Sequence, residues 1–280
     1  MERLHFSSGP EVSLDTVRAI PKPCRIAESA CLKAAAMGPL LKHHGDRSEP
    51  RLAGTRSRLR CPLLPFVAIL ALFTAESCMA DQGIYSLPEP AIASDRCLNA
   101  ILQNRRTTRA FSPQPVSLAE VAQLLWAAQG ITSPEGYRTA PSAGALYPLE
   151  LHLVAGDVEG LPAGHYRYQP RLHALKAADL GDNRQLIAKA ALHQDWVAQA
   201  PVVVVVSAIA SRTSGKYGQR GLRYVHMEVG HASQNLLLQA VALGLGGAVV
   251  GAFDDTALKD LLRLPGDEHP LAILPVGHPR

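Results

Sequence analysis

The chain has 280 residues, and its 47% apolar content is enough for a large buried core, which excludes a disordered chain. Residues 1–80 contain 11 Lys/Arg and 7 Asp/Glu, whereas residues 81–280 contain 17 of each, so the charge of the second part gives no reason to expect nucleic acid as a partner. Four of the five cysteines also precede residue 81, which excludes a disulfide framework and a four-cysteine zinc site in the second part.

The first 80 residues divide into two parts. Residues 1–55 contain five prolines and no sustained hydrophobic period, so we expect an unstructured leader or a translation start assigned too far upstream. Residues 56–80 combine three arginines, an apolar run and small residues near a cleavage point, which is the layout of a signal peptide. The apolar run, residues 62–75, is shorter than the roughly 20 residues of a membrane span. We therefore expect export, with a periplasmic location and no stable membrane span; a cytoplasmic or membrane-anchored protein is the alternative if the signal is not cleaved.

Two helices are predicted early in the second part. Residues 81–94 contain two prolines and are expected to be a linker before one domain over residues 95–280. A first helix is expected to run to about residue 104. The next begins with the capping box Ser117-Leu-Ala-Glu120, in which each side chain can satisfy a free amide of the first turn, and ends at Gly130.

Strands dominate the middle of the chain. Alternation over 149–155 predicts a half-buried strand, and 166–175 predicts a hairpin. After a helix near 183–193, the valine run of 201–206 is typical of a strand buried on both faces.

A long helix is predicted over 223–243, with Gly244 as its stop. An apolar strand-like stretch at 248–250, a short helix opened by Asp254 and a last strand at 271–274 follow. Helices and strands do not alternate regularly, so the pattern indicates an α+β fold.

Two segments carry residues suited to ligand binding, one to a phosphate and the other to a planar molecule. Residues 105–109 place three guanidiniums and two hydroxyls together, and such groups bind a phosphate dianion with charge-assisted forks. A solvated surface run is the alternative. The small residues of 139–148 allow backbone to approach a planar ligand closely, although an ordinary turn has the same composition.

The long helix also carries a polar stripe, Glu228, His231 and Asn235, in a segment otherwise suited to burial. Buried polar groups must be paired, so the stripe should meet a ligand, a second subunit or another polar chain; a hydrogen-bonded core histidine explains His231 equally well. The sequence contains neither a glycine-rich fingerprint for dinucleotide binding nor a nucleophile elbow. The spacing of His226 and His231 does not place both on one helix face, so no metal site is expected.

Four motifs occur in the order found in one known family. They are Arg105–Phe111, Pro141–Pro148, Gly230–Asn235 with Leu243–Gly246, and Val250–Phe253. Together they resemble the FMN-dependent nitroreductase family, and most of all its SagB/ThcOx-type oxidase branch, which includes dehydrogenases that aromatise thiazolines and oxazolines in modified peptides. The resemblance covers about residues 95–279.

This resemblance implies a nitroreductase-like α+β fold, with a central, mainly antiparallel sheet flanked by helices, that forms a homodimer and holds FMN at the subunit interface. The positions implied for the phosphate and ribityl chain are Arg105, Arg106, Thr107 and Arg109, with Arg280 in place of a basic residue that family members carry after the last strand. The positions implied for the flavin ring are Pro141, Ser142, Ala143, Gly144 and Asn235, with amides around Val250, Gly251 and Ala252 near nitrogen N5.

Lys216-Tyr217 is similar to the Lys-Tyr pair to which azoline oxidases assign proton transfer; a charged loop with an extended lysine is the alternative. The function implied is an FMN-dependent oxidoreductase that moves hydride to or from N5. Its substrate would be a small or peptide-derived molecule, a nitroaromatic or a quinone, with NAD(P)H or another electron donor or acceptor. The alternative is an inactive flavin-binding or interaction scaffold.

Overall fold

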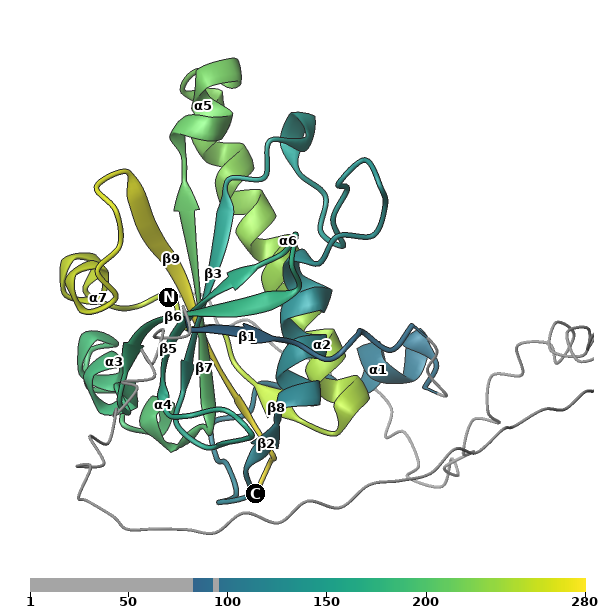
Figure 1. Ribbon diagram of the computed structural model, residues 1–280, viewed down its shortest axis with the longest axis vertical. Coiled ribbons are helices and arrows are strands. Elements are labelled where there is room, and N and C mark those ends of the chain that lie inside the picture. Colours follow the sequence, from purple (N-terminus) through teal and green to yellow (C-terminus); the bar gives the residue numbers. More distant parts are fainter. Residues whose placement is uncertain (1–82, 93–95) are drawn as a thin grey trace, which may run out of the picture. The chain divides into compact units, whose positions relative to one another are not determined.

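A computed structural model describes residues 83–92 and 96–280 (Figure 1). The leader and signal peptide expected over residues 1–80 lie outside the described residues. Within the described ranges, no helix combines the length and apolarity that a membrane span needs.

Seven strands form one sheet in the order β1-β6-β5-β3-β7-β9-β8, and every neighbouring pair is antiparallel. The expected mainly antiparallel sheet is therefore confirmed, with one short parallel pair, β2 and β4, beside it. The strands are β1 (Ile84–Ser86), β2 (Val116–Ser117), β3 (Leu149–Ala155), β4 (Val158–Glu159), β5 (Gly164–Gln169), β6 (Ala174–Leu180), β7 (Val202–Ile209), β8 (Gly246–Gly247) and β9 (Glu268–Gly277).

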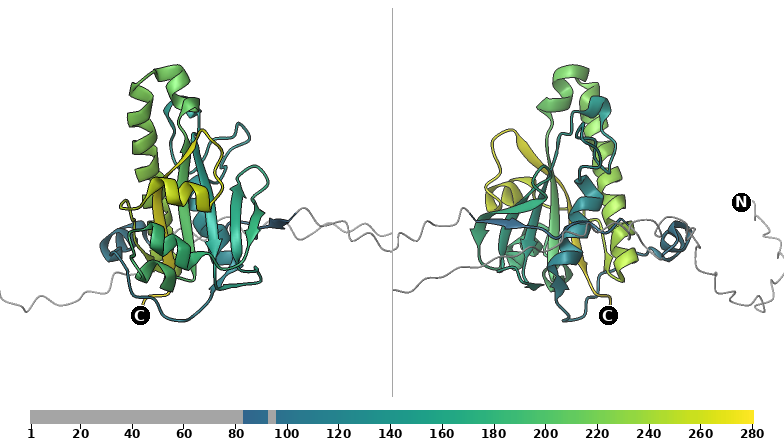
Figure 2. Two further views of the ribbon diagram at one scale, coloured as in Figure 1. Left: turned by 90° about the vertical axis from the view of Figure 1, so that its left-hand side faces the viewer. Right: turned by 45° about the vertical axis from the view of Figure 1, so that its right-hand side comes forward.

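Helices cover both faces of this sheet (Figures 1 and 2). One core cluster joins the sheet to α2 and α6, and a second joins its other face to α3, α4 and α7. The helices are α1 (Leu98–Asn104), α2 (Leu118–Gln129), α3 (Arg184–Ala190), α4 (Trp196–Gln199), α5 (Ser211–Tyr217), α6 (Arg220–Leu243) and α7 (Asp255–Leu261).

The local chemistry read from the sequence sets several element ends. At the start of α2, the Ser117 hydroxyl accepts the amide of Glu120 at 3.2 Å, and the Glu120 carboxylate accepts the amide of Ser117 at 2.8 Å, so the predicted capping box is confirmed. Gly244 ends α6 with φ of 82°, a left-handed conformation that favours glycine. The valine run of β7 is buried on both faces, as predicted.

The half-buried character predicted for β3 is wrong. His152 lies on the face that the alternating pattern assigned to solvent, yet only 3% of it is exposed. The reason is that β3 is an inner strand, between β5 and β7, and the second layer of helices covers this face as well. A polar residue in an alternating pattern therefore lies in a core here.

Other differences concern segments whose partners lie far away in the sequence. Residues 84–86, within the expected linker, form the edge strand β1, which pairs with β6. The stretch near Val250 contributes one bridge, to Ile273, rather than a strand. The first helix buries none of its residues, and Leu98 and Leu102 are 60% and 49% exposed. A single copy of the chain thus leaves the apolar side of α1 uncovered.

Candidate functional site

The arginine-rich segment that follows α1 lies beside β8 and the end of β9. Thr107 forms a parallel bridge with Gly247, and the amide of Thr108 donates to the Gly247 carbonyl at 2.9 Å. The amide of Arg280 donates to the Ala110 carbonyl at 3.1 Å, so the last residue of the chain lies next to the segment. Arg280 therefore lies beside the segment that carries the other arginines predicted to bind a phosphate.

Four arginines lie in or beside this segment at this end of the sheet, and we call them the arginine clamp: Arg105, Arg106, Arg109 and Arg280. In the described part of the chain, none of them forms an ion pair with an acidic side chain. Arg106 donates to two nearby carbonyls, at 2.8 and 3.0 Å, and Arg109 lies 5.6 Å from the ring centre of Trp196. Forked cationic donors without a counter-charge fit a phosphate dianion.

The turn at Val250–Ala252 lies further along the same strand. Val250 exchanges both backbone hydrogen bonds with Ile273, so its amide is occupied. The amides of Gly251 and Ala252 donate to no group in the described residues, and both residues are exposed. Ile273 is three residues before Val276, which pairs with β8 next to the clamp, so about 10 Å of strand separates this turn from the clamp. Two free donors are thus available to the edge of a planar ligand.

The small-residue loop lies at the other end of the sheet, against α6. The amide of Ala143 donates to the Glu228 carboxylate at 2.9 Å, and the amide of Tyr147 donates to the Ser142 hydroxyl at 2.9 Å. Between them, Gly144 has φ of 64° in a 3₁₀ turn at Ala143–Ala145. Pro141 and Gly144 are exposed, so the loop presents backbone and small side chains outward.

Lys216 and Tyr217, at the end of α5, lie against this loop. A Cβ atom placed on Gly144 would be 2.8 Å from the Tyr217 hydroxyl and 3.1 Å from the Lys216 Nζ atom. The Tyr217 ring is held edge-on to Tyr224, with 5.2 Å between ring centres. Two groups that are more than 70 residues apart in the sequence are therefore in contact.

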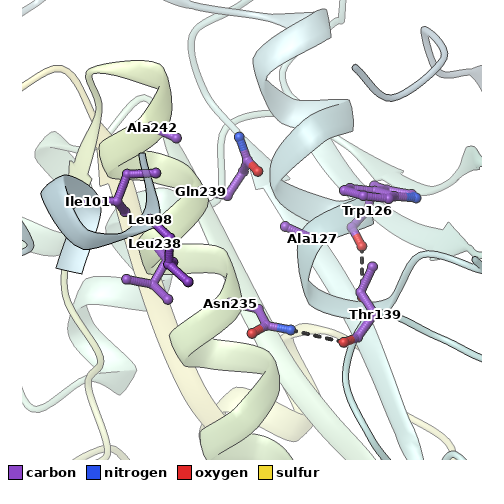
Figure 3. A pocket seen from close by; sticks show the side chains of 9 residues that line it. All are labelled: Leu98, Ile101, Trp126, Ala127, Thr139, Asn235, Leu238, Gln239 and Ala242. Atoms are coloured by element: carbon purple, nitrogen blue, oxygen red, sulfur yellow. Dashed lines mark hydrogen bonds between the residues drawn. The ribbon is translucent and has the colours of Figure 1, made fainter. Parts of the chain in front are cut away.

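The polar stripe of α6 is paired in part. Glu228 is 4% exposed and holds the loop, and Asn235 Nδ2 donates to the Thr139 carbonyl at 3.3 Å. Figure 3 shows Asn235 in the wall of a pocket of about 260 Å³ between α1, α2 and α6. His231 is exposed, so the interpretation as a core histidine is wrong: it lies on the outward side of the helix.

The predicted site residues form two separate groups in one chain. At one end of β9, Glu268 pairs with Ile209, which lies next to α5. At the other end, Gly277 pairs with Gly246, which lies next to the clamp. Nine steps of about 3.4 Å make roughly 30 Å between these ends. Figure 1 shows the same separation, with α5 at one end of α6 and the C-terminus at the other. The loop and Lys216 therefore do not face the clamp within a single chain.

A buried polar cluster lies apart from both groups, between the sheet and the second layer of helices. His152 contacts His165 at 2.9 Å and Glu268 at 2.6 Å, and Ser207 also donates to Glu268. Burial lowers the pKa of His165 to about 4. Burial alone would raise the pKa of Glu268, but the hydrogen bonds from His152 and Ser207 outweigh it and lower this pKa to about 2. All four side chains are buried, so the cluster lies within the core.

Sequence reasoning missed Trp196, which packs against Arg109, and Arg212 and Glu150, which connect α5 to the sheet. Nothing in the sequence marks Trp196, because α4 lies 87 positions from the arginine it contacts. The sequence could have drawn attention to Glu150 and Arg212, because Glu150 lies within the mostly apolar segment 149–155 and Arg212 follows the apolar segment 201–210.

Three comparisons place the chain among known proteins. The model described as "Nitroreductase family" matches residues 102–278. "Putative nitroreductase MJ1384" of Methanocaldococcus jannaschii is 43% identical over 180 residues, which are 64% of this chain and 90% of that protein. "Microcin B17-processing protein McbC" of Escherichia coli is 28% identical over 155 residues, 53% of this chain and 57% of that protein. The crystal structure of a "putative nitroreductase" from Ralstonia eutropha JMP134 superposes with a TM-score of 0.63 at 29% identity, covering 71% of this chain and 90% of that one.

Proposed function

This chain belongs to the nitroreductase family of oxidoreductases, and we propose that it is an FMN-dependent enzyme that works as a homodimer. The donor set supports FMN: the clamp offers cationic forks that no acidic side chain of the described part neutralises. The free amides of Gly251 and Ala252 and the small-residue loop offer close approach to a flat ring.

One observation carries the proposal of a dimer. The clamp and the loop lie at opposite ends of β9, roughly 30 Å apart, which is more than the length of FMN. A second copy can bring its own loop to the clamp, and the uncovered apolar side of α1 gives it a surface to pack against. Each of the two sites would then contain the clamp of one copy and the loop of the other.

Different residues of this chain would bind the phosphate, orient the flavin ring and exclude water. Arg105, Arg106, Arg109 and Arg280 bind the phosphate, with Thr107 and Asn235 as further cofactor contacts. The amides near Gly251 orient the ring, while Pro141 to Gly144 of the other copy cover it and exclude water. When bound, FMN supplies a centre at N5 that accepts or donates a hydride.

Lys216 and Tyr217 would move the proton that accompanies the hydride. A substrate that gives up a hydride from one atom loses a proton from a neighbouring atom, and the unprotonated Lys216 amine or Tyr217 phenolate can accept that proton. In the reverse direction, the same groups donate a proton to a quinone or nitro compound while it is being reduced. Their contact with Gly144 places both groups at the loop that covers the ring.

The relatives suggest the class of substrate. Two of them are named for processing the peptides microcin B17 and trifolitoxin, at 28% and 26% identity. We propose a small or peptide-derived substrate, or a nitroaromatic or quinone, with NAD(P)H or another electron donor or acceptor.

FMN titration of the purified chain tests the proposal. We expect one FMN per chain, a dimer in solution, and slower turnover with retained flavin for Lys216→Ala. Lys189→Ala is the matched control, because Lys189 is an exposed lysine that contacts no acidic group of the described part. A colourless protein that does not bind FMN would support the alternative of an interaction scaffold and overturn the proposal.

A further inference from the structure

Arg212, in the first turn of α5, joins three segments through one guanidinium. Its Nη1 atom donates to the Tyr147 carbonyl at 3.0 Å, and its Nη2 atom lies 2.7 Å from Oε1 of Glu150. Tyr147 belongs to the loop that contains Gly144, and Glu150 belongs to β3. The guanidinium therefore connects α5, the loop and the sheet.

Glu150 is held in place by a second arginine. Arg167 Nη2 lies 3.1 Å from Oε2 of Glu150 and 3.8 Å from Oε2 of Glu268. Each carboxylate oxygen of Glu150 thus has its own arginine, and the side chain cannot rotate without breaking an ion pair. Glu268 is fully buried and is held by His152, so the series of contacts ends on a fixed group in the core.

Besides Arg212, α5 is positioned by the chain just before it, where the Ile209 amide donates to the Pro148 carbonyl at 2.9 Å, and by its contacts with α6. It is seven residues long and has no side-chain cap at its N-terminus. Among the described residues, Arg212 is the one side chain of α5 that forms a hydrogen bond or an ion pair. The contacts of α5 with α6 include the Tyr217–Tyr224 ring pair and the close approach of Gly221 to Ser214, where a Cβ atom would lie 2.7 Å from the Ser214 Cα atom. Thr213 is fully buried, and Lys216 and Tyr217 lie against Gly144 of the loop.

Without the Arg212 contacts, the end of α5 that carries Lys216 and Tyr217 would keep its packing on α6 but have no side-chain ion pair to the sheet and no side-chain hydrogen bond to the loop within the described residues. We propose that Arg212 and Glu150 are positioning residues that hold Lys216 and Tyr217 against Gly144. The inference rests on the proposed role of Lys216 in proton transfer. Arg212 and Glu150 act through the position of α5 and touch neither the ring nor the substrate.

The test measures a single turnover that needs no natural electron donor. The FMN-loaded enzyme is reduced with dithionite and mixed with menadione, and the flavin absorbance is followed in a stopped-flow instrument. The quinone takes a hydride from the reduced flavin and a proton from the protein, so quinol and oxidised flavin form in equal amounts. Arg212→Ala is compared with Lys216→Ala and with the double variant.

We expect Arg212→Ala to slow reoxidation about 10- to 100-fold, because a displacement of about 1 Å at a catalytic group costs this much. The loss of rate in the double variant should be smaller than the product of the two single losses, since both changes remove proton transfer by Lys216, and any additional loss comes from Tyr217, which Arg212 also positions. Glu150→Gln should reproduce the defect, and Arg212→Lys should recover part of the rate because lysine contacts one acceptor rather than both. Arg223→Ala, an exposed arginine of α6 with no partner among the described residues, should match the unmodified enzyme.

Hydrogen exchange gives a readout independent of activity. Amides at 214–218 should exchange faster in Arg212→Ala, with or without FMN, while those of α6 after residue 225 stay unchanged. Rate losses that multiply in the double variant, or unchanged exchange in α5, would overturn the inference. An unchanged rate in Lys216→Ala would instead refute the proposed role of Lys216, and the exchange result alone would then decide whether Arg212 holds α5.

Discussion

Removal of two clamp arginines, Arg105→Ala with Arg109→Ala, should weaken FMN binding without unfolding the chain. Charge-assisted hydrogen bonds contribute about 1.5–3 kcal/mol each, so the loss of one such bond from each arginine costs about 3–6 kcal/mol of binding free energy. The dissociation constant of FMN should therefore rise roughly 10²- to 10⁴-fold. The fold itself should lose little, because within the described part neither side chain forms a hydrogen bond or ion pair, and the stacking of Arg109 on Trp196 is worth about 0.5–1 kcal/mol at an exposed site.

Fluorescence titration of FMN into the flavin-free protein measures this change. Arg171→Ala with Arg223→Ala is the matched control, because it removes two exposed positive charges from other parts of the surface. We expect the control to bind FMN as the unmodified chain does. If the clamp variant keeps its unmodified affinity, or if both variants weaken equally, the phosphate lies elsewhere and the assignment of the clamp is refuted.

Two further predictions concern the loop and the core. Gly144→Ala should lower turnover at least tenfold, because the new Cβ atom would displace Lys216 and Tyr217. Gly160→Ala is the control: Gly160 also has a positive φ but no neighbour within 4 Å, so each variant should lose about 1 kcal/mol of stability, while Gly160→Ala leaves turnover unchanged. Equal turnover in the two variants would contradict the contact between Gly144 and the two side chains. The free energy of unfolding should fall by about 3 kcal/mol as the pH falls from 6.5 to 4, because His165 becomes protonated over this range in the unfolded chain but not in the folded chain, where its pKa is near 4. Urea titrations of His165→Gln should lack this loss of stability. An identical dependence of stability on pH in the variant would contradict the role of His165.

Local chemistry was sufficient to predict the elements whose ends depend on neighbouring residues. The capping box of α2, the glycine stop of α6 and the buried valine strand each need information from a few adjacent positions. The exposure of His152 was mispredicted because it depends on helices contributed by a later part of the chain. The place of β1 in the sheet likewise depends on a partner, β6, about 90 positions away.

The residues of the candidate site could be predicted by type, but their grouping could not. The sequence places Thr107 and Gly144 37 positions apart, yet the antiparallel sheet puts them at opposite ends. Lys216 is much further from Gly144 in sequence, and it lies in contact with the loop. Sequence distance carries little information here, because strand direction decides which loops share an end of the sheet.

Mixed dimers test the central claim, a site shared between two copies, most directly. One copy carries Arg105→Ala with Arg109→Ala, the other carries Lys216→Ala, and different tags allow the mixed dimer to be purified. In the shared arrangement, one of its two sites combines an intact clamp with an intact loop. We predict one tightly bound FMN per mixed dimer and turnover at about half the unmodified rate, although each parent dimer is defective. Turnover no higher than that of the Lys216→Ala dimer would show that clamp and loop act within one chain, and would contradict the account.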